Sequence, residues 1–268
     1  PEKYRGMSRE AARKQIVSDL KDINHLIKEE DYLHKVGYSE RGNVPIEYYL
    51  SEQWFLKMKN LAKPAINAVR NKEINFYPNH WVKTYNHWMD NIQDWCISRQ
   101  LYWGHQIPVW YKKDADRSNQ DNWFVSTTPP TDLENWEQDN DILDTWFSSW
   151  LWPFAVHGWP DIKTTKYFPT NALVTGPDII FFWVARMMMF GMEFLNKEPF
   201  KDIYVHALVR DEKGQKMSKS KGNVIDPLNI IEKYSADALR FTLLSMASPG
   251  TDVKLSEDRV KGYRNFLN

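Results

Sequence analysis

Four lysines lie close together in one loop of the sequence, and their spacing suits the binding of a polyphosphate. They are Lys213, Lys216, Lys219 and Lys221, with glycines at positions 214 and 222. Lysine ammonium groups are point charges on flexible stems, and glycine lets a loop adopt conformations that other residues avoid. A loop that closes over a triphosphate would offset the charge that develops as pyrophosphate leaves. On charge alone, a solvated basic hairpin or a nucleic-acid-binding patch explains the same residues.

A second candidate site is Gly176-Pro177-Asp178, which directly follows the apolar stretch 172–175. Glycine at the end of a strand allows a ligand to approach the backbone closely. Asp178 has two interpretations, because an aspartate at the start of a helix also caps free N–H groups. Pro177 suits the first position of a helix.

Three large apolar residues, Trp146, Ile179 and Trp183, form a third candidate group. Ile179 and Trp183 are four residues apart and share one face of a predicted helix over 179–194. Together with Trp146 they would wall a small apolar pocket, although ordinary core packing is the simpler interpretation.

The elements around these residues follow the order strand, helix, strand, loop, helix. The strands are predicted at 172–175 and 203–209, and the last helix runs through Arg240. This order is typical of an α/β fold with a parallel sheet, in which ligands bind beyond the carboxyl ends of the strands. His206 lies near such an end, where a buried core histidine is the competing interpretation.

The upstream part of the chain is predicted to be helical and irregular. A helix is predicted after Ser8, with an apolar side that reaches Ile27, followed by irregular or β structure over 32–50. A second helix is predicted over 52–69, interrupted at Pro64, and an aromatic helix over 81–95. A strand over 107–111 and a polar excursion over 112–140 follow.

The composition limits the function classes. Thirty-five basic and 35 acidic side chains give a formal net charge of +0, so a global basic footprint for nucleic acid is absent. The single cysteine, Cys96, excludes an internal disulfide and a zinc site built on several cysteines. No apolar run is long enough to cross a membrane. The chain does not begin with Met, and we expect an excised segment of a longer protein.

The string Lys216-Met217-Ser218-Lys219-Ser220, followed by Gly222 to Pro227, resembles the second signature of class I aminoacyl-tRNA synthetases. The stretch 203–244 is similar to the valine, isoleucine and leucine subgroup. The resemblance implies the second half of a Rossmann-type parallel-sheet catalytic domain with helical and irregular insertion segments. It implies that Lys216 and Lys219 are catalytic, with Lys219 on the ATP phosphates. It further implies ATP-binding roles for Gly176, Asp178, His206 and Leu208, with the ribose at Asp178 and adenine against 206–208.

Within the subgroup, 144–149 and 178–187 resemble the valine-specific members. This resemblance assigns the amino-acid pocket to Trp146, Ile179 and Trp183, because the isoleucine-specific pattern of an Asp after Trp-Phe and a Gln-His pair is absent. The implied partners are valine, ATP with Mg²⁺, and tRNA(Val), with no metal held by the chain itself. The implied setting is a cytoplasmic enzyme that is monomeric at full length.

The resemblance also implies a division of the chain. Residues 1–80 would hold the tail of an editing insertion and the re-entry into the catalytic domain, supported by 38–41, 50–55 and 94–105. Residues 81–250 would form the catalytic half-domain, and 251–268 the connection to a helical anticodon-binding domain. None of the seven histidines has the His-x-Gly-His spacing of the first signature, so the chain alone is expected to be inactive. An isoleucine-specific relative, a tRNA-binding module without a working ATP site, and an inert structural domain stay open as alternatives.

Overall fold

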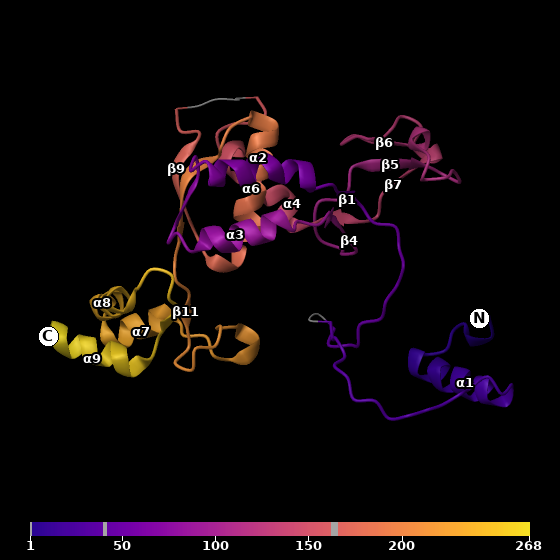
Figure 1. The fold of residues 1–268 in the computed structure, drawn as a ribbon, viewed down its shortest axis with the longest axis horizontal. Coiled ribbons are helices and arrows are strands. Elements are labelled where there is room, and N and C mark those ends of the chain that lie inside the picture. The colour runs from indigo at the N-terminus through magenta and orange to yellow at the C-terminus, as the bar shows by residue number, and fades with distance from the viewer. Residues whose placement is uncertain (1, 40–41, 162–165) are drawn as a thin grey trace. The chain divides into compact units, whose positions relative to one another are not determined.

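The computed structural model describes residues 2–39, 42–161 and 166–268, without the side chain of Ser220. Positions 40 and 41, part of the expected re-entry stretch 38–41, lie outside the described residues. The chain divides into two compact units, Pro1–Glu52 and Gln53–Asn268, which are described separately (Figure 1). Whether 1–80, 81–250 and 251–268 correspond to parts of a longer enzyme stays a prediction.

The described residues of the first unit contain one α-helix, α1 (Arg9–Asp22), which follows a short 3-10 turn, η1 (Glu2–Tyr4). The helix begins after Ser8, as predicted. The Ser8 side chain caps it by accepting a hydrogen bond from the backbone N–H of Ala11 at 3.2 Å. The predicted apolar side does not reach Ile27, which is 99% exposed. The helix ends earlier because Asn24 adopts a left-handed backbone conformation, with φ 56°.

The second unit is built on a three-stranded parallel sheet, which confirms the predicted α/β class. Its strands lie in the order β2 (Asn75–Tyr77), β10 (Phe200–Val205) and β9 (Thr170–Thr175). The register pairs Val205 with Thr175, so the carboxyl ends of β9 and β10 are level. The predicted strand over 203–209 is interrupted. It stops at Val205 and resumes as β11 (Val209–Arg210), which pairs with β12 (Val253–Lys254).

Helices pack around the sheet in one hydrophobic core (Figure 1). They are α2 (Lys59–Arg70), α3 (Trp81–Asp90) and α6 (Ala185–Leu195). The start predicted for α2 was too early, because β1 (Phe55–Leu56) precedes it and pairs with β3 (Trp95–Cys96). Pro64 lies inside α2 without ending it. A proline removes one backbone hydrogen bond, and here the helix is held by a buried face that includes Ala62, Ala65, Ile66 and Val69.

The aromatic helix is shorter than its 81–95 pattern predicted. It ends at Asp90, with Tyr85 and Met89 buried, and Trp95 lies in β3. The spacing of apolar residues could not predict where the helix ends. Trp95 is buried although it lies in a strand, so it fits the apolar pattern of the helix without belonging to it.

The stretch 98–143 forms a small antiparallel region, where the sequence predicted a strand over 107–111 and a polar excursion over 112–140. Its strands are β4 (Ser98–Arg99) paired with β8 (Ile142–Leu143), and β6 (Trp123–Val125), β5 (Val109–Lys112) and β7 (Trp136–Gln138) in that order, with 3-10 turns η2 (Gln120–Asn122) and η3 (Leu133–Asn135). Ile107, Val109 and Tyr111 form its own small core.

The segment after β9 departs from the predicted α-helix over 179–194. It begins as a 3-10 turn, η4 (Pro177–Ile179), continues as a π-helix, η5 (Ile180–Val184), and becomes α6 only at Ala185. Two short helices, α4 (Thr145–Ser149) and α5 (Trp152–Ala155), precede β9. Trp150 between them stacks on Phe190 of α6 at 4.1 Å between ring centroids.

The end of the chain forms a helical group with a separate hydrophobic cluster. Its helices are α7 (Pro227–Tyr234), α8 (Ala236–Met246) and α9 (Glu257–Leu267), preceded by the 3-10 turn η6 (Lys219–Lys221). Its buried members are Ile230, Tyr234, Ala238, Leu239, Leu255 and Val260. Among the helices of the described residues, none is long and apolar enough to span a membrane.

Candidate functional site

The two strand ends bring Gly176, Asp178 and His206 together. The backbone N–H of His206 donates to the carbonyl of Thr175 at 2.9 Å, which keeps the strand ends side by side. A Cβ added to Gly176 would lie 2.9 Å from Asp178 Oδ1 and 3.8 Å from His206 Cε1. Only glycine leaves this space open, as expected for a place where a ligand approaches the backbone.

Asp178 faces the lysine loop. Its Oδ2 accepts a hydrogen bond from Lys216 Nζ at 3.2 Å, an ion pair across 38 residues of sequence. The structure thus joins two residues that the sequence could only place in separate motifs. Both side chains are exposed, so both are accessible to a ligand.

His206 is exposed, and its interpretation as a buried core histidine is wrong. Its Nδ1 lies 2.8 Å from the carbonyl oxygen of Ala207. A contact between His206 and a nucleotide base stays a prediction.

The backbone of Leu208 is already engaged. Its N–H donates to Asp252 Oδ1 at 3.1 Å, and its carbonyl accepts from the N–H of Val253 at 2.9 Å. Arg210 pairs with the same Asp252 and holds the pKa of that carboxyl below its usual range. The Cδ2 atom of Leu208 lies 3.7 Å from the Cβ position at Gly176, and a contact between Leu208 and a ligand stays a prediction. No local pattern marks Asp252 in the sequence, because its contacts depend on the pairing of β11 with β12.

The lysine loop has a defined backbone. Gly214 and Gly222 adopt left-handed conformations, with φ 78° and 66°, which supports the expected need for glycine. The Ser218 hydroxyl accepts from the N–H of Lys221 at 3.3 Å and begins η6. Lys219 is exposed, and no carboxylate among the described residues forms an ion pair with it. Its ammonium group is available to an anionic ligand.

Two of the three predicted pocket residues share a cavity. Trp146 and Trp183 line a hollow of about 410 Å³ together with Ser148, Ser149 and Leu151. The indole N–H of Trp183 donates to the carbonyl of Ser149 at 3.0 Å. Ile179 is not among the lining residues, since η4 and η5 replace the regular helix that would have aligned it with Trp183.

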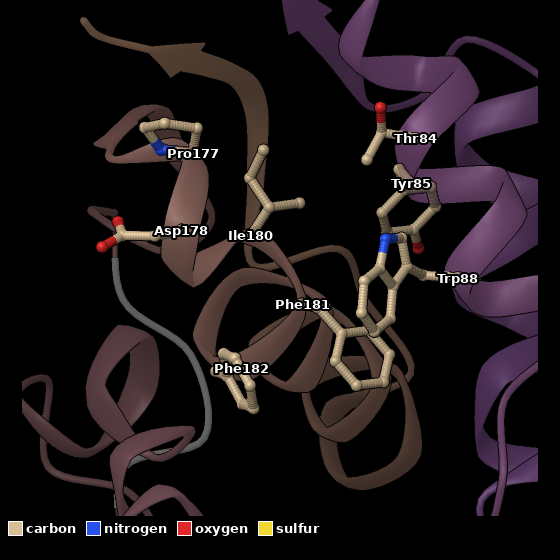
Figure 2. Close-up of a pocket in the computed structure, with 8 residues that line it drawn as sticks. All are labelled: Thr84, Tyr85, Trp88, Pro177, Asp178, Ile180, Phe181 and Phe182. Atoms are coloured by element: carbon tan, nitrogen blue, oxygen red, sulfur yellow. The ribbon is translucent and has the colours of Figure 1, made fainter. Parts of the chain in front are cut away.

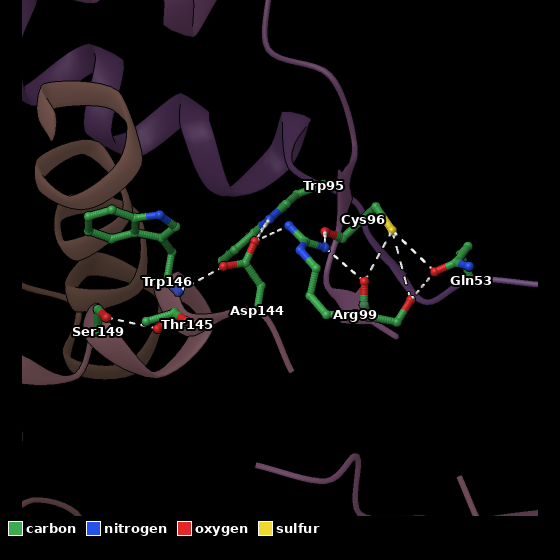
Figure 3. A network of polar contacts seen from close by, with 9 residues as sticks. Gln53, Trp95, Cys96, Arg99, Asp144, Thr145, Trp146 and Ser149 are labelled. Carbon is green, nitrogen blue, oxygen red and sulfur yellow. Dashed lines mark hydrogen bonds and ion pairs between the residues drawn. The ribbon is translucent and has the colours of Figure 1, made fainter. Parts of the chain in front are cut away.

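A buried network holds the backbone of Trp146 (Figure 3). Asp144 is 7% exposed, and its Oδ1 accepts from the N–H of Trp146 at 2.9 Å. Its Oδ2 accepts from the indole N–H of Trp95 at 3.3 Å and pairs with Arg99. The guanidinium of Arg186 lies 3.5 Å from the Trp95 ring centroid, and burial lowers the pKa of Arg186 to about 10.

Sequence reasoning missed Asp144 as a site residue, although an aspartate before a helix is a known capping signal. It also missed a second cavity of about 260 Å³ beside Asp178 (Figure 2). This cavity is mainly apolar and is lined by Thr84, Tyr85, Trp88, Pro177, Asp178, Ile180, Phe181 and Phe182. Among the described residues, no group of three or more His, Cys, Asp or Glu side chains is placed to hold a metal ion.

A family model described as tRNA synthetases class I (I, L, M and V) matches residues 5–256. The match covers more than half of the chain, and the chain belongs to this family. The resemblance inferred from the lysine loop is thereby confirmed.

Two curated relatives with high identity to this chain are both valine–tRNA ligases. The chain is 62% identical over 274 residues to a valine–tRNA ligase of Pelagibacter ubique and 53% identical over 270 residues to one of Anoxybacillus flavithermus. The two alignments cover 100% and 99% of this chain. The chain spans only 31% and 30% of the length of those two enzymes.

Solved structures agree at the level of the fold. A Mycobacterium tuberculosis methionyl-tRNA synthetase in complex with methionyl-adenylate superposes with a TM-score of 0.63 at 20% identity, covering 86% of this chain and 40% of that one. An Agrobacterium radiobacter LeuRS in a ternary complex with tRNA and LeuAMS gives 0.53 at 21% identity, covering 66% and 27%.

Proposed function

We propose that this chain is part of a longer valine–tRNA ligase that activates valine with ATP and transfers it to tRNA(Val). The observation that carries the proposal is the 62% identity to a valine–tRNA ligase along the whole chain. The meeting of Lys216 with Asp178 supports it, because a nucleotide would need both residues on one side of the sheet.

In the proposed reaction, ATP lies across the carboxyl ends of β9 and β10. Asp178 accepts hydrogen bonds from the ribose hydroxyls, with Gly176 leaving room for the sugar, and the base lies against His206 and Leu208. A carboxylate oxygen of valine attacks the α-phosphorus, and the bond to pyrophosphate breaks. Lys216 and Lys219 stabilise the negative charge on the departing phosphates. A hydroxyl of the tRNA terminus then attacks the valyl carbonyl, and AMP leaves.

Mg²⁺ would accompany the triphosphate. Magnesium is commonly held by substrate phosphates with one or two carboxylates, and the described residues offer no ready cluster of protein ligands. We therefore assign no residue of this chain to the ion.

The amino-acid side chain would lie at the pocket of Trp146 and Trp183, with Ile179 as a third wall in the ligand-bound enzyme. One methylene group in an apolar pocket is worth only about 1–3 kcal/mol. Rigid indole walls would discriminate against isoleucine mainly by excluding its larger side chain. The longer enzyme is proposed to be a cytoplasmic monomer.

A chimera tests the proposal. This chain would replace the matching segment of the Pelagibacter ubique enzyme, and ATP–pyrophosphate exchange would be measured with valine and with isoleucine. We expect robust valine-dependent exchange in the chimera and none with the chain alone, which lacks the first signature. Faster exchange with isoleucine would refute the valine assignment. An inactive chimera, together with salt-dependent RNA binding by this chain alone, would support a tRNA-binding module instead.

A further inference from the structure

Two side chains join the ends of the lysine loop, at positions to which neither motif nor resemblance assigned a role. Asn223 Nδ2 donates to Asp211 Oδ2 at 2.9 Å, which closes a loop of 13 residues, 211–223. Both residues are partly buried. We refer to this pair as the Asp211–Asn223 clasp.

The clasp also binds the backbone on either side of Met217. Asn223 Oδ1 accepts from the N–H of Ser218 at 2.9 Å, and Asn223 Nδ2 lies 3.3 Å from the carbonyl oxygen of Lys216. Asp211 Oδ1 accepts from the N–H of Gln215 at 2.7 Å. The residues immediately before and after Lys216-Met217 are thus fixed by one amide and one carboxylate.

The chemistry at position 223 requires an amide. A single side chain must accept one hydrogen bond from Ser218 and donate others to Asp211 and Lys216, which an amide can do and a carboxylate cannot. An aspartate there would place two carboxylates at hydrogen-bond distance, where like charges repel. The hydrogen bond from Asn223 is also the largest cause that holds the pKa of Asp211 below its usual range.

We propose that Asp211 and Asn223 are positioning residues for the adenylation step, which set where Lys216 and Lys219 stand relative to Asp178. The inference rests on the proposed function. The clasp fixes the backbone from which Lys216 reaches Asp178 at 3.2 Å, and the turn that carries Lys219 begins directly after it at Ser218. Without the clasp, the two ammonium groups would sample many positions, and a triphosphate would have to order them on binding.

A reciprocal exchange of the two residues separates positioning from simple damage. Asn223→Asp removes both donors, and Asp211→Asn removes the charge. In the double variant, an asparagine at 211 can donate to an aspartate at 223, while the N–H groups of Gln215 and Ser218 keep their acceptors. Only the hydrogen bond to the Lys216 carbonyl stays lost, so most of the clasp is restored.

The variants would be compared in the chimera by ATP–pyrophosphate exchange. We expect Asn223→Asp to raise the KM for ATP and lower kcat, each by about tenfold, with the KM for valine unchanged. The double variant should recover to within about threefold of the unsubstituted chimera. Asp116→Asn is the matched control, because Asp116 accepts from the N–H of Ser118 at 2.9 Å in an exposed turn outside the loop.

Hydrogen exchange at the amide of Ser218 in this chain gives a readout independent of activity. Protection should fall in Asn223→Asp and return in the double variant. Equal effects on the KM values of valine and ATP, or no recovery in the double variant, would overturn the positioning role. An unsubstituted chimera without valine-dependent exchange would instead overturn the proposed function and the positioning role with it, while Ser218 exchange would still report on the clasp.

Discussion

At the carboxyl end of the parallel sheet, Asp178 meets the lysine loop through an exposed ion pair with Lys216. The backbone N–H of Trp146, by contrast, is held by the buried carboxylate of Asp144. The side chains of Lys216 and Asp178 are 69% and 45% exposed, but that of Asp144 is 8% exposed. We call the region of Asp178 and the lysine loop the nucleotide end. We call the region of Trp146, Trp183 and Asp144 the pocket wall.

The difference in burial has a functional consequence. Exposed ion pairs contribute about 0–1 kcal/mol, so in the proposed reaction the nucleotide end would rearrange at little cost when a triphosphate binds. A buried carboxylate with several partners is costly to disturb, so the pocket wall keeps its shape. A rigid wall suits discrimination between similar side chains, and an adaptable loop suits charge that develops during a reaction.

The largest effect on the reaction is expected at the nucleotide end, from Lys219→Ala in the chimera. Loss of one group that stabilises developing charge typically lowers kcat by about 10²–10³-fold. We expect this loss in ATP–pyrophosphate exchange, with the unfolding free energy of the chain unchanged, since Lys219 is exposed. Lys213→Ala is the matched control and should retain most activity. An unchanged rate for Lys219→Ala would support an inert structural domain.

At the pocket wall, Asp144→Ala should affect stability first. It leaves Trp95 and the N–H of Trp146 without their acceptor and Arg99 without its carboxylate. Because Arg99 is partly exposed, we expect a loss of about 2 kcal/mol in urea unfolding of the chain. Asp144→Asn should recover part of this loss by keeping the cap on Trp146. Lys216→Ala, at the nucleotide end, should change stability by less than about 0.5 kcal/mol, and a larger change would remove the contrast between the regions.

A smaller effect is expected from Gly176→Ala. This substitution crowds the Asp178 carboxylate without straining the backbone at position 176. Gly176 has φ −79°, a conformation open to alanine, so the fold should be unaffected. The new methyl group would lie 2.9 Å from Asp178 Oδ1 and displace that carboxylate. We expect the KM for ATP in the chimera to rise about fivefold, with the KM for valine unchanged. A normal KM for ATP would show that Asp178 does not hold the nucleotide.

The sequence predicted the nucleotide end better than the pocket wall. Strand ends and glycine positions follow from local patterns, and Gly176, Asp178 and His206 converge because parallel strands end at one edge of the sheet. The split between β10 and β11 was missed because Ala207, Leu208 and Val209 continue the apolar pattern of the strand. Their pairing with 252–254 depends on a segment more than 40 residues away.

Around the pocket wall, local helix rules failed. The spacing of Ile179 and Trp183 assumed regular helical geometry, but η4 and η5 intervene. Burial of Asp144 and Arg186 also depends on tertiary packing against Trp95. The spacing of apolar residues indicates which side of a helix is buried. It does not indicate where the helix changes from 3-10 to π or α geometry.

The smallest expected effect is that the hydrogen bonds of the Asp211–Asn223 clasp weaken at acid pH. Hydrogen bonds from Asn223 and from the N–H of Gln215 hold the pKa of Asp211 below its ordinary value of 3.8. A carboxyl whose pKa is lowered by folding contributes its stabilisation above the unfolded value and loses it as the pH falls further. The amide of Gln215, corrected for intrinsic exchange, should therefore lose protection as the pH falls below 3.8. The amide of Ala238 is the control, because its acceptor is the neutral hydroxyl of Ser235. In Asp211→Asn the Gln215 amide should show no such step, and a step of equal size there would assign the acid response to another group.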